Sequence, residues 1–544
     1  MEKIVIGAAL GECVHVAGVM NFLRLAEMAG WKTIFLGPAV PIEKVILEAK
    51  RQNATLVGVS YRLTPETGER LLGEFAEAAD GLRENGVKFA FAGTPELAQK
   101  AGKMDFFDTV FQGGEPADQV LAYLKDEKST GDQQKESPQR LVDRIRWKSP
   151  FPIIRHHFGL PDLEETRRGI ERIADSRVLD VISLGIDQDA QENFFHPERQ
   201  DPRRRGAGGV PVRSAEDYQM LYAASRRGNL PLLRTYSGTD DFIRLAEMYQ
   251  ETINIAWCAI PLFWFNQMDG RGPWDLEGSI NEHQQVMAWY GKQGIPVELN
   301  EPHHWGMRDA SDVIFAVSAY LSAYNAKAFG VKDYIAQLMF NSPPEHSDAM
   351  DLAKMLAVIE LITPLESPEF RIWKQTRTGL LSYPLNHAEA RAHLAASVYL
   401  QMAIKPQIIH VVGYTEADHA ATADDVIESC TMARRSIENA IKGAPEMTSD
   451  PEIQQRKEEI ISEVHDVLKY IKNLSDDAID PFTDRRALTK AVRLGILDAP
   501  QLKNNPIARG ITLTRVINGT CVSVDENGRK ISEGKRISKL LEKE

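Results

Sequence analysis

Hydrophobic positions over residues 1–125 alternate between short apolar runs and longer stretches with helical spacing. KIVIGAAL, residues 3–10, is a continuous apolar run typical of a buried strand. GVMNFLRLAEMAG follows with apolar residues three and four apart, which predicts a helix. The alternation predicts a doubly wound parallel sheet with strands at 3–10, 32–37, 54–60, 88–93 and 108–113.

The polar stretch at residues 126–140 has no apolar period and is predicted to be a linker. From 141 to 445 strand-like runs return at a longer spacing, and their number approaches the eight strands of a (β/α)₈ barrel. Residues 446–544 begin with a charged helix and continue into a hairpin with an Asn-Gly turn, so we expect a C-terminal α+β extension. The barrel strands are predicted at 177–185, 230–236, 253–263, 295–301, 334–341, 370–377 and 407–414.

Composition narrows the class of protein. A chain of 544 residues is too long for one hydrophobic core, and a net charge of −13 gives no general affinity for nucleic acid or anionic membranes. No apolar run reaches the length of a transmembrane helix, and the start of the chain lacks the features of a signal peptide. The four cysteines are isolated, which fits a reduced compartment. We therefore expect a cytoplasmic protein without nucleic-acid or membrane partners.

Loops after the strands of a doubly wound sheet bind ligands, so the loop after the first strand is a candidate site. Its sequence is GECVHVAG, with His15 three residues before Gly18. The later segments VGVSYRLTPE, FAGT and FQGG follow in the same loop positions of strands three, four and five. An imidazole can bind a metal, glycines allow close approach of the backbone to a ligand, and a serine can form hydrogen bonds.

Together these segments resemble the cobalamin-binding domain of B12-dependent mutases and methyltransferases, which has a flavodoxin-like fold. The resemblance implies that His15 ligates cobalt and that the other residues line a groove for the nucleotide tail. Three positions depart from the family pattern: Cys13 replaces an aspartate, Arg62 a leucine, and Thr94 a glycine. The implied cofactor-binding residues are Cys13, His15, Gly18, Ser60, Arg62, Leu63, Gly93, Thr94, Gly113 and Gly114.

Polar residues also follow the predicted barrel strands, where barrel enzymes place their chemistry. Arg234 ends one strand, NEPHHW places Glu301, His303 and His304 after another, and TEADH adds Glu416, Asp418 and His419. Such histidines and carboxylates can act as acids and bases or as pocket lining, and less often as metal ligands. The segment Arg155–His157 is predicted to precede the first strand and to lie outside the site.

The barrel and C-terminal segments resemble the large (epsilon) subunit of glutamate mutase. The resemblance implies that Arg234 binds a substrate carboxylate, with Arg203 to Arg205 as a possible further contact, and that Glu416 lies near the adenosyl ribose. Asn341 is expected to contact the cofactor. The positions of the family's catalytic glutamate and two tyrosines hold Ile260, Asn266 and Gly270 here, so we expect a substrate other than glutamate.

The sequence thus predicts an adenosylcobalamin-dependent carbon-skeleton mutase that acts on a small carboxylic acid and forms a homodimer through the barrel. The catalytic residues would be Arg234, Glu301, His303, Glu416 and His419. A corrinoid methyltransferase using methylcobalamin is an alternative, because SYRLT is about as close to the pattern of methyl-corrinoid proteins. A cobalamin-binding protein without catalytic activity is a second alternative.

Overall fold

The computed structural model describes residues 3–113, 115, 117–125, 137–475 and 480–542. The chain forms two compact units, residues 1–135 and 136–544, each with its own core. Among the described residues, no helix combines the length and the apolar character needed to cross a membrane.

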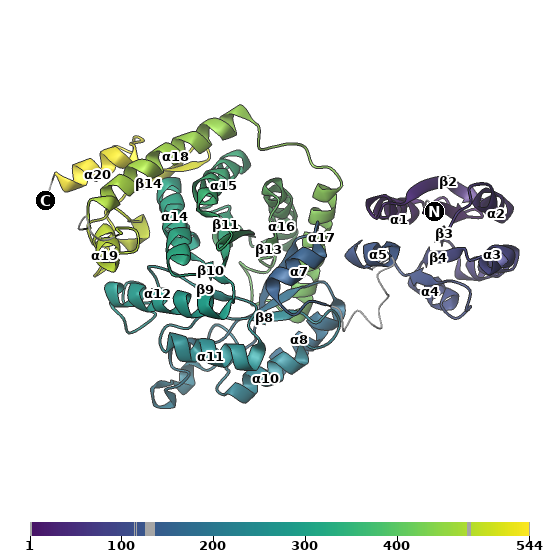
Figure 1. Ribbon diagram of the computed structural model, residues 1–544, viewed down its shortest axis with the longest axis horizontal. Coiled ribbons are helices and arrows are strands. Elements are labelled where there is room, and N and C mark those ends of the chain that lie inside the picture. Colours follow the sequence, from purple (N-terminus) through teal and green to yellow (C-terminus); the bar gives the residue numbers. More distant parts are fainter. Residues whose placement is uncertain (1–2, 114, 116, 126–136, 476–479, 543–544) are drawn as a thin grey trace. The chain divides into compact units, whose positions relative to one another are not determined.

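The first unit is a five-stranded parallel sheet in the order β2-β1-β3-β4-β5 (Figure 1), as the sequence predicted. Because β1 lies between β2 and β3, the chain leaves β1 at the point where the strand order reverses. The strands are β1 Ile4–Leu10, β2 Lys32–Val40, β3 Leu56–Tyr61, β4 Lys88–Gly93 and β5 Thr109–Phe111. The helices are α1 Ala17–Met28, α2 Ile42–Arg51, α3 Pro65–Glu84, α4 Pro95–Ala101 and α5 Ala117–Leu124.

Two hydrophobic clusters cover the opposite faces of this sheet. Successive side chains of β1 alternate between them, with Val5 in the cluster under α1 and α5 and Ile6 in the cluster under α2 and α3. Burial on both faces explains why the strands are continuous apolar runs in the sequence. This is the flavodoxin-like arrangement expected for residues 1–125.

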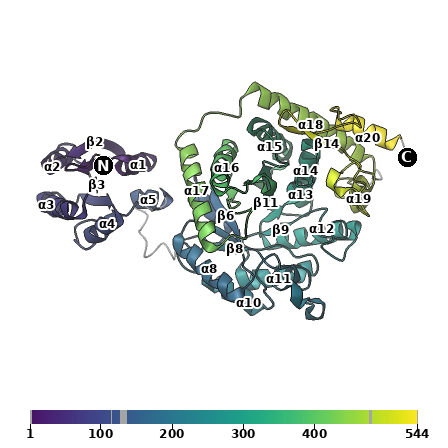
Figure 2. The ribbon, with the colours of Figure 1, turned by 180° about the vertical axis from the view of Figure 1, so that it is seen from behind.

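The second unit contains an eight-stranded parallel barrel ringed by helices (Figure 2). The order is β8-β7-β6-β13-β12-β11-β10-β9, and a bridge from Tyr236 to Ala259 joins the two ends. The strands are β6 Ile153–Phe158, β7 Val181–Leu184, β8 Leu232–Arg234, β9 Cys258–Ile260, β10 Val297–Leu299, β11 Asp333–Phe340, β12 Arg371–Thr378 and β13 Ile408–His410. The helices that follow them are α8 Leu163–Ser176, α10 Ala215–Ala224, α11 Phe242–Ile253, α12 Leu276–Gln293, α14 Asp312–Ala328, α15 Asp348–Ile362, α16 His387–Gln401 and α17 Ala423–Ile441.

The first barrel strand, β6, is the one that the sequence pattern missed. The prediction that Arg155–His157 precede the first strand is wrong, because these three residues lie within β6. Polar side chains interrupt β6, so it lacks the continuous apolar run by which the other strands were predicted. Arg234 consequently ends the third strand of the barrel and not the second.

An apolar layer closes the barrel at the amino ends of its strands. Ile153 of β6, Val181 of β7 and Leu232 of β8 pack there with Trp257 and with α7, Leu141–Lys148. These side chains are almost fully buried. The layer fills the amino end of the barrel, so the carboxyl ends of the strands are where a ligand can enter.

The C-terminal segment packs against α14 and α15 through α18, Pro451–Lys472. It continues through α19, Arg485–Arg493, into the hairpin of β14, Thr514–Ile517, and β15, Thr520–Ser523, and ends with α20, Glu533–Leu541. Asn518 and Gly519 form the two-residue turn of this hairpin, both with positive φ, as the Asn-Gly prediction required. Buried residues of α18 and α20 belong to the same hydrophobic cluster as the barrel helices.

Replacing Leu232 with alanine should lower the free energy of unfolding of the barrel by about 2–5 kcal/mol, because it leaves a cavity in the sealing layer. The matched control is Leu381→Ala, since Leu381 is 57% exposed. Urea unfolding followed by tryptophan fluorescence measures both. Equal midpoints for the two variants would contradict the role given to the apolar layer.

Candidate functional site

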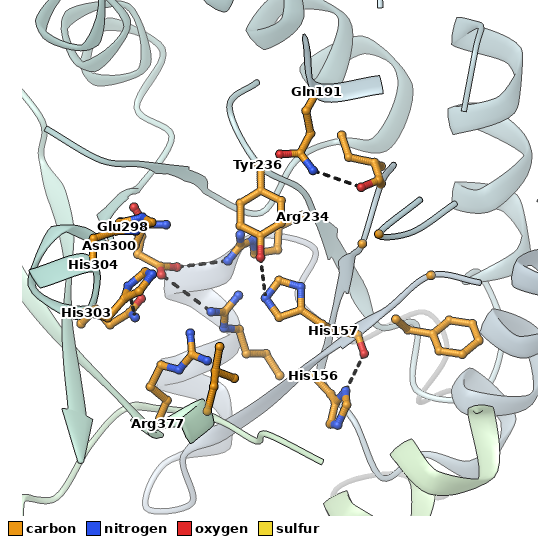
Figure 3. Close-up of a pocket in the computed structure, with 18 of the residues that line it drawn as sticks. His156, His157, Gln191, Arg234, Tyr236, Glu298, Asn300, His303, His304 and Arg377 are labelled. Carbon is orange, nitrogen blue, oxygen red and sulfur yellow. Dashed lines mark hydrogen bonds and ion pairs between the residues drawn. The ribbon is translucent and has the colours of Figure 1, made fainter. Parts of the chain in front are cut away.

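A cavity of about 530 Å³ opens inside the barrel above the apolar layer. Strand residues line its depth, and residues from the loops after the strands line its upper part (Figure 3). The lining contains five arginines, and its carboxylates among the described residues are Glu298 and Glu416. The cavity therefore carries an excess of positive charge.

Glu298 of β10 binds two arginines in the depth of the cavity. Arg234 Nη1 lies 3.2 Å from Glu298 Oε2, and Arg155 Nη2 lies 3.7 Å from Oε1. The indole of Trp257 donates a 2.7 Å hydrogen bond to Oε2. Burial raises the pKa of Glu298, but the two guanidinium groups outweigh burial and hold the pKa below its ordinary value. The carboxylate is therefore ionised, and it is paired with the two guanidinium groups.

The arginines keep nitrogen atoms that have no protein partner. Arg234 is 1% exposed, yet its Nε and Nη2 atoms donate to no group within the part of the chain that the structure describes. Arg155 donates to Ser183 at 2.8 Å and to His410 at 2.7 Å, while its Nε atom is also unpartnered. A buried guanidinium with free N–H groups is costly unless a ligand supplies acceptors. These atoms indicate an anion site.

Arg377, at the end of β12, is a third cation of the cavity (Figure 3). Its only hydrogen bond among the described residues is a 3.4 Å contact from Nε to the carbonyl of Thr378. Burial lowers its pKa, and the negative charges of Glu416 and Glu298 offset part of this effect. Because its terminal amino groups have no protein acceptor, Arg377 can receive a second anionic group.

Neutral histidines surround these charges. Burial lowers the pKa of His157, His303 and His304, and nearby positive charges lower each further. His303 Nδ1 lies 2.7 Å from the amide nitrogen of Gln337, whereas both ring nitrogens of His304 are without a partner. His157 lies 3.3 Å from the hydroxyl of Tyr236. Each imidazole can therefore exchange hydrogen bonds with a ligand without adding charge.

Glu301 lies outside this lining, although it adjoins His303 in the sequence. It starts the short helix α13, Glu301–Gly306, and its carboxylate accepts hydrogen bonds from the amides of Leu262 and Phe263 at 2.6 and 2.9 Å. Trp305 donates a third at 2.6 Å. Burial raises the pKa of Glu301 to about 7. In this position the carboxylate fixes the loop after β9.

Glu416 and His419 lie at the rim, in the loop after β13. Glu416 lines both the barrel cavity and an adjoining one of about 360 Å³, and burial raises its pKa. His419 is exposed and binds Asp418 at 2.7 Å and Asp425 at 3.2 Å. His387 reaches the same Asp418 oxygen at 2.9 Å. These hydrogen bonds hold the histidines and carboxylates of the rim together.

The remaining barrel candidates do not line the cavity. Asn341 follows β11 with φ +55°, and its side-chain oxygen accepts a 2.7 Å hydrogen bond from Ser397. Arg203 is an exposed partner of Asp201, and Arg204 binds Asp189. The structure therefore brings together Arg234, His303 and Glu416 from the predicted set, and it places Glu301, His419 and Asn341 elsewhere.

In the first unit, His15 lies in the loop between β1 and α1 with its side chain exposed. Cys13 is fully buried in the core, and its sulfur lies 4.0 Å from Nδ1 of His15. The thiol thus occupies an apolar position, whereas an ionised aspartate there would need a polar partner. The outer side of the imidazole remains open to a ligand.

Strand pairing brings other predicted groove residues to the same end of the sheet. Ser60 of β3 pairs with Ala9 of β1, and Gly93 of β4 pairs with Tyr61 of β3. Ser60 is 4% exposed, and its hydroxyl has no hydrogen-bond partner among the described residues. A buried, unpaired polar atom therefore lies at the point where the strand order reverses. A Cβ on Gly93 would lie 2.7 Å from the ring of Phe91, which favours glycine there.

The other groove candidates lie in neighbouring loops. Arg62 and Leu63 are exposed between β3 and α3, and Thr94 precedes α4. Gly18 belongs to the first turn of α1, where an added Cβ would meet open space. Gly113 follows β5 with φ +87°, a conformation that favours glycine. Gly114 lies outside the described residues.

Sequence reasoning missed Arg155, Glu298 and Arg377, which all lie within strands. Glu298 and Gln337 interrupt the apolar runs of β10 and β11, and both are almost fully buried. Charged residues in the middle of predicted barrel strands were the available signal, since such residues face either solvent or a polar interior. Residues in the loops after the strands do not include them.

Replacing Glu298 with glutamine should destabilise the second unit by about 3 kcal/mol, because Arg155 and Arg234 lose their shared counter-charge. Malonate should raise the melting temperature of this variant more than that of the wild type, since an added anion replaces the lost carboxylate. Differential scanning fluorimetry measures both, with Glu416→Gln as the control at the rim. A variant as stable as the wild type would contradict the charge balance described above.

No protein-family model and no curated protein matches the chain. Among solved structures, a cobalamin-binding protein from Desulfitobacterium hafniense DCB-2 is similar over 23% of this chain and 56% of its own, at 24% identity and a TM-score of 0.19. The YdjI aldolase from Escherichia coli K12 is similar over 60% of this chain and 99% of its own, at 11% sequence identity and a TM-score of 0.29. OxsB, a cobalamin-dependent S-adenosylmethionine radical enzyme, is similar over 88% of this chain and 69% of its own, at 10% sequence identity and a TM-score of 0.18. With these scores, none of the three carries an inference about function.

Proposed function

We propose that the protein is a cobalamin-dependent enzyme that rearranges the carbon skeleton of a small carboxylic acid, with adenosylcobalamin as its cofactor. One observation carries the proposal: buried guanidinium groups with free N–H atoms converge in a cavity at the carboxyl ends of the barrel strands. That end is where barrel enzymes place their chemistry. A carboxylate is the anion whose geometry suits a guanidinium fork.

The first unit supports the choice of cofactor. His15 is exposed after β1, in the loop that the resemblance assigns to cobalt ligation, and Ser60 offers an unpartnered hydroxyl near the switch point. The donor set fits the group, because an imidazole nitrogen suits cobalt and a buried hydroxyl suits a polar atom of the nucleotide tail. When bound, adenosylcobalamin supplies a carbon-centred radical by homolysis of its cobalt–carbon bond.

The barrel residues bind and orient the substrate in this proposal. Arg234 holds one carboxylate through its free Nε and Nη2 atoms, while Glu298 fixes the guanidinium from the other side. Arg377 receives a second anionic group. His303 and His304 offer neutral hydrogen-bonding atoms beside the substrate, and the apolar layer below excludes water from that side.

Substituting His15 with alanine should abolish the base-off, histidine-on visible spectrum of the cobalamin complex, because the chain has no other histidine before His156. Val14→Ala is the matched control, since Val14 lies in the same loop and is 63% exposed. The spectrum is recorded after purification with adenosylcobalamin. An unchanged spectrum in the His15 variant would refute cobalt ligation.

Ser60→Ala should weaken cobalamin binding about fivefold while His15 ligation persists, because one buried hydrogen bond to the cofactor is lost. Equilibrium dialysis gives the affinity, and the visible spectrum reports the ligation state. An affinity equal to that of the wild type would mean that the unpartnered hydroxyl does not face the cofactor.

A further inference from the structure

We infer that the barrel cavity selects dicarboxylic acids whose remaining polar substituent is uncharged, such as a hydroxyl group, and rejects those that carry an ammonium group. The inference rests on the proposed function, since it takes this cavity to be the substrate site. It is carried by the distribution of charged and neutral polar atoms around the cavity.

The lining is strongly cationic. Besides Arg155, Arg234 and Arg377, it includes Arg271 and Arg308. Arg271 pairs with Asp269 at 2.8 Å, and Arg308 lies over the ring of Trp264 at 4.0 Å. Because Asp269 neutralises Arg271, four guanidinium groups remain against the two carboxylates Glu298 and Glu416, an excess of two positive charges. A ligand with two negative charges restores the balance, whereas an added ammonium group restores the excess.

No carboxylate in the depth is free to receive an ammonium group, among the residues that the structure describes. Glu298 is 1% exposed, and Arg155, Arg234 and Trp257 already surround its two oxygens. An ammonium group near Glu298 would therefore lie beside two guanidinium groups. Like charges in a low-dielectric site repel strongly, so this position disfavours an amino acid.

Uncharged side chains that can form hydrogen bonds with a substrate hydroxyl group also line the cavity. Asn300 and Gln337 line the cavity, and their buried side-chain oxygens accept no hydrogen bond from the residues that the structure describes. His304 adds two unpartnered ring nitrogens, and its position beside His303 is shown in Figure 3. A hydroxyl group can donate to an amide oxygen or to the acceptor nitrogen of neutral His304, and it can accept from the ring N–H, without placing a further positive charge among the arginines.

Glu416 is the one remaining carboxylate of the lining among the described residues, and it lies at the rim. Burial raises the pKa of Glu416 and the positive charge of Arg377 lowers it, so the two groups interact within the cavity. If a substrate ammonium group were bound anywhere in the cavity, Glu416 would be its partner. Substitution of Glu416 therefore distinguishes between hydroxy acids and amino acids as the substrate class.

Calorimetric titration of the full chain with matched acids tests the inference. The pairs are L-malate with L-aspartate and L-2-hydroxyglutarate with L-glutamate, which differ only in a hydroxyl or an ammonium group. We expect the hydroxy acids to bind about 100-fold more tightly, the scale of one like-charge contact at ~6 Å in a protein site. In Glu416→Gln the hydroxy acids should remain the tighter ligands of each pair.

Equal binding within a pair, tighter binding of the amino acid, or no binding of any of the four acids would overturn the inference. If Glu416→Gln lost binding of the amino acids but kept binding of the hydroxy acids, Glu416 would be identified as an ammonium site. That result would also overturn the inference. The titrations need no cobalamin. A chain that prefers hydroxy acids but binds no cobalamin would refute the proposed function and leave this inference standing.

Discussion

Burial of two guanidinium groups beside one carboxylate, Glu298, is the constraint on which the barrel site depends. Removing such cations from water is costly, and Glu298 compensates only part of that cost. The barrel tolerates this because its strands fix Arg155, Arg234 and Glu298 rigidly and because the apolar layer beneath them supplies hydrophobic stability. The free N–H groups that remain are the property that a carboxylate ligand would use.

The pattern of apolar residues predicted the architecture well, because most strands are buried on both faces and their helices are amphipathic. It failed at β6, where Arg155, His156 and His157 interrupt the apolar run. The same reason hid Glu298, since an inward-facing polar residue in a strand has no signature in a single sequence that separates it from an outward-facing one. Closure of the barrel, a long-range property, reveals which way these side chains point.

In NEPHHW, closeness in the sequence led to the wrong expectation that Glu301 shares a site with His303. Glu301 and His303 are two residues apart, yet the carboxylate binds the backbone after β9 while the imidazole lines the cavity. In the first unit the parallel strand order was enough to predict that the loops of His15 and Ser60 share one end of the sheet. That the hydroxyl of Ser60 is buried without a partner depends on packing, and no sequence pattern reports it.

The claim that two separate guanidinium groups each receive a carboxylate is tested most directly by titrating the full chain with succinate and with its monomethyl ester. Succinate should bind with a 1:1 stoichiometry, and esterifying one carboxylate should weaken binding at least about tenfold, the scale of one charge-assisted hydrogen bond. Arg377→Gln should weaken succinate binding and reduce the difference between the two ligands. Equal affinity of the wild-type chain for the diacid and the ester would contradict the account.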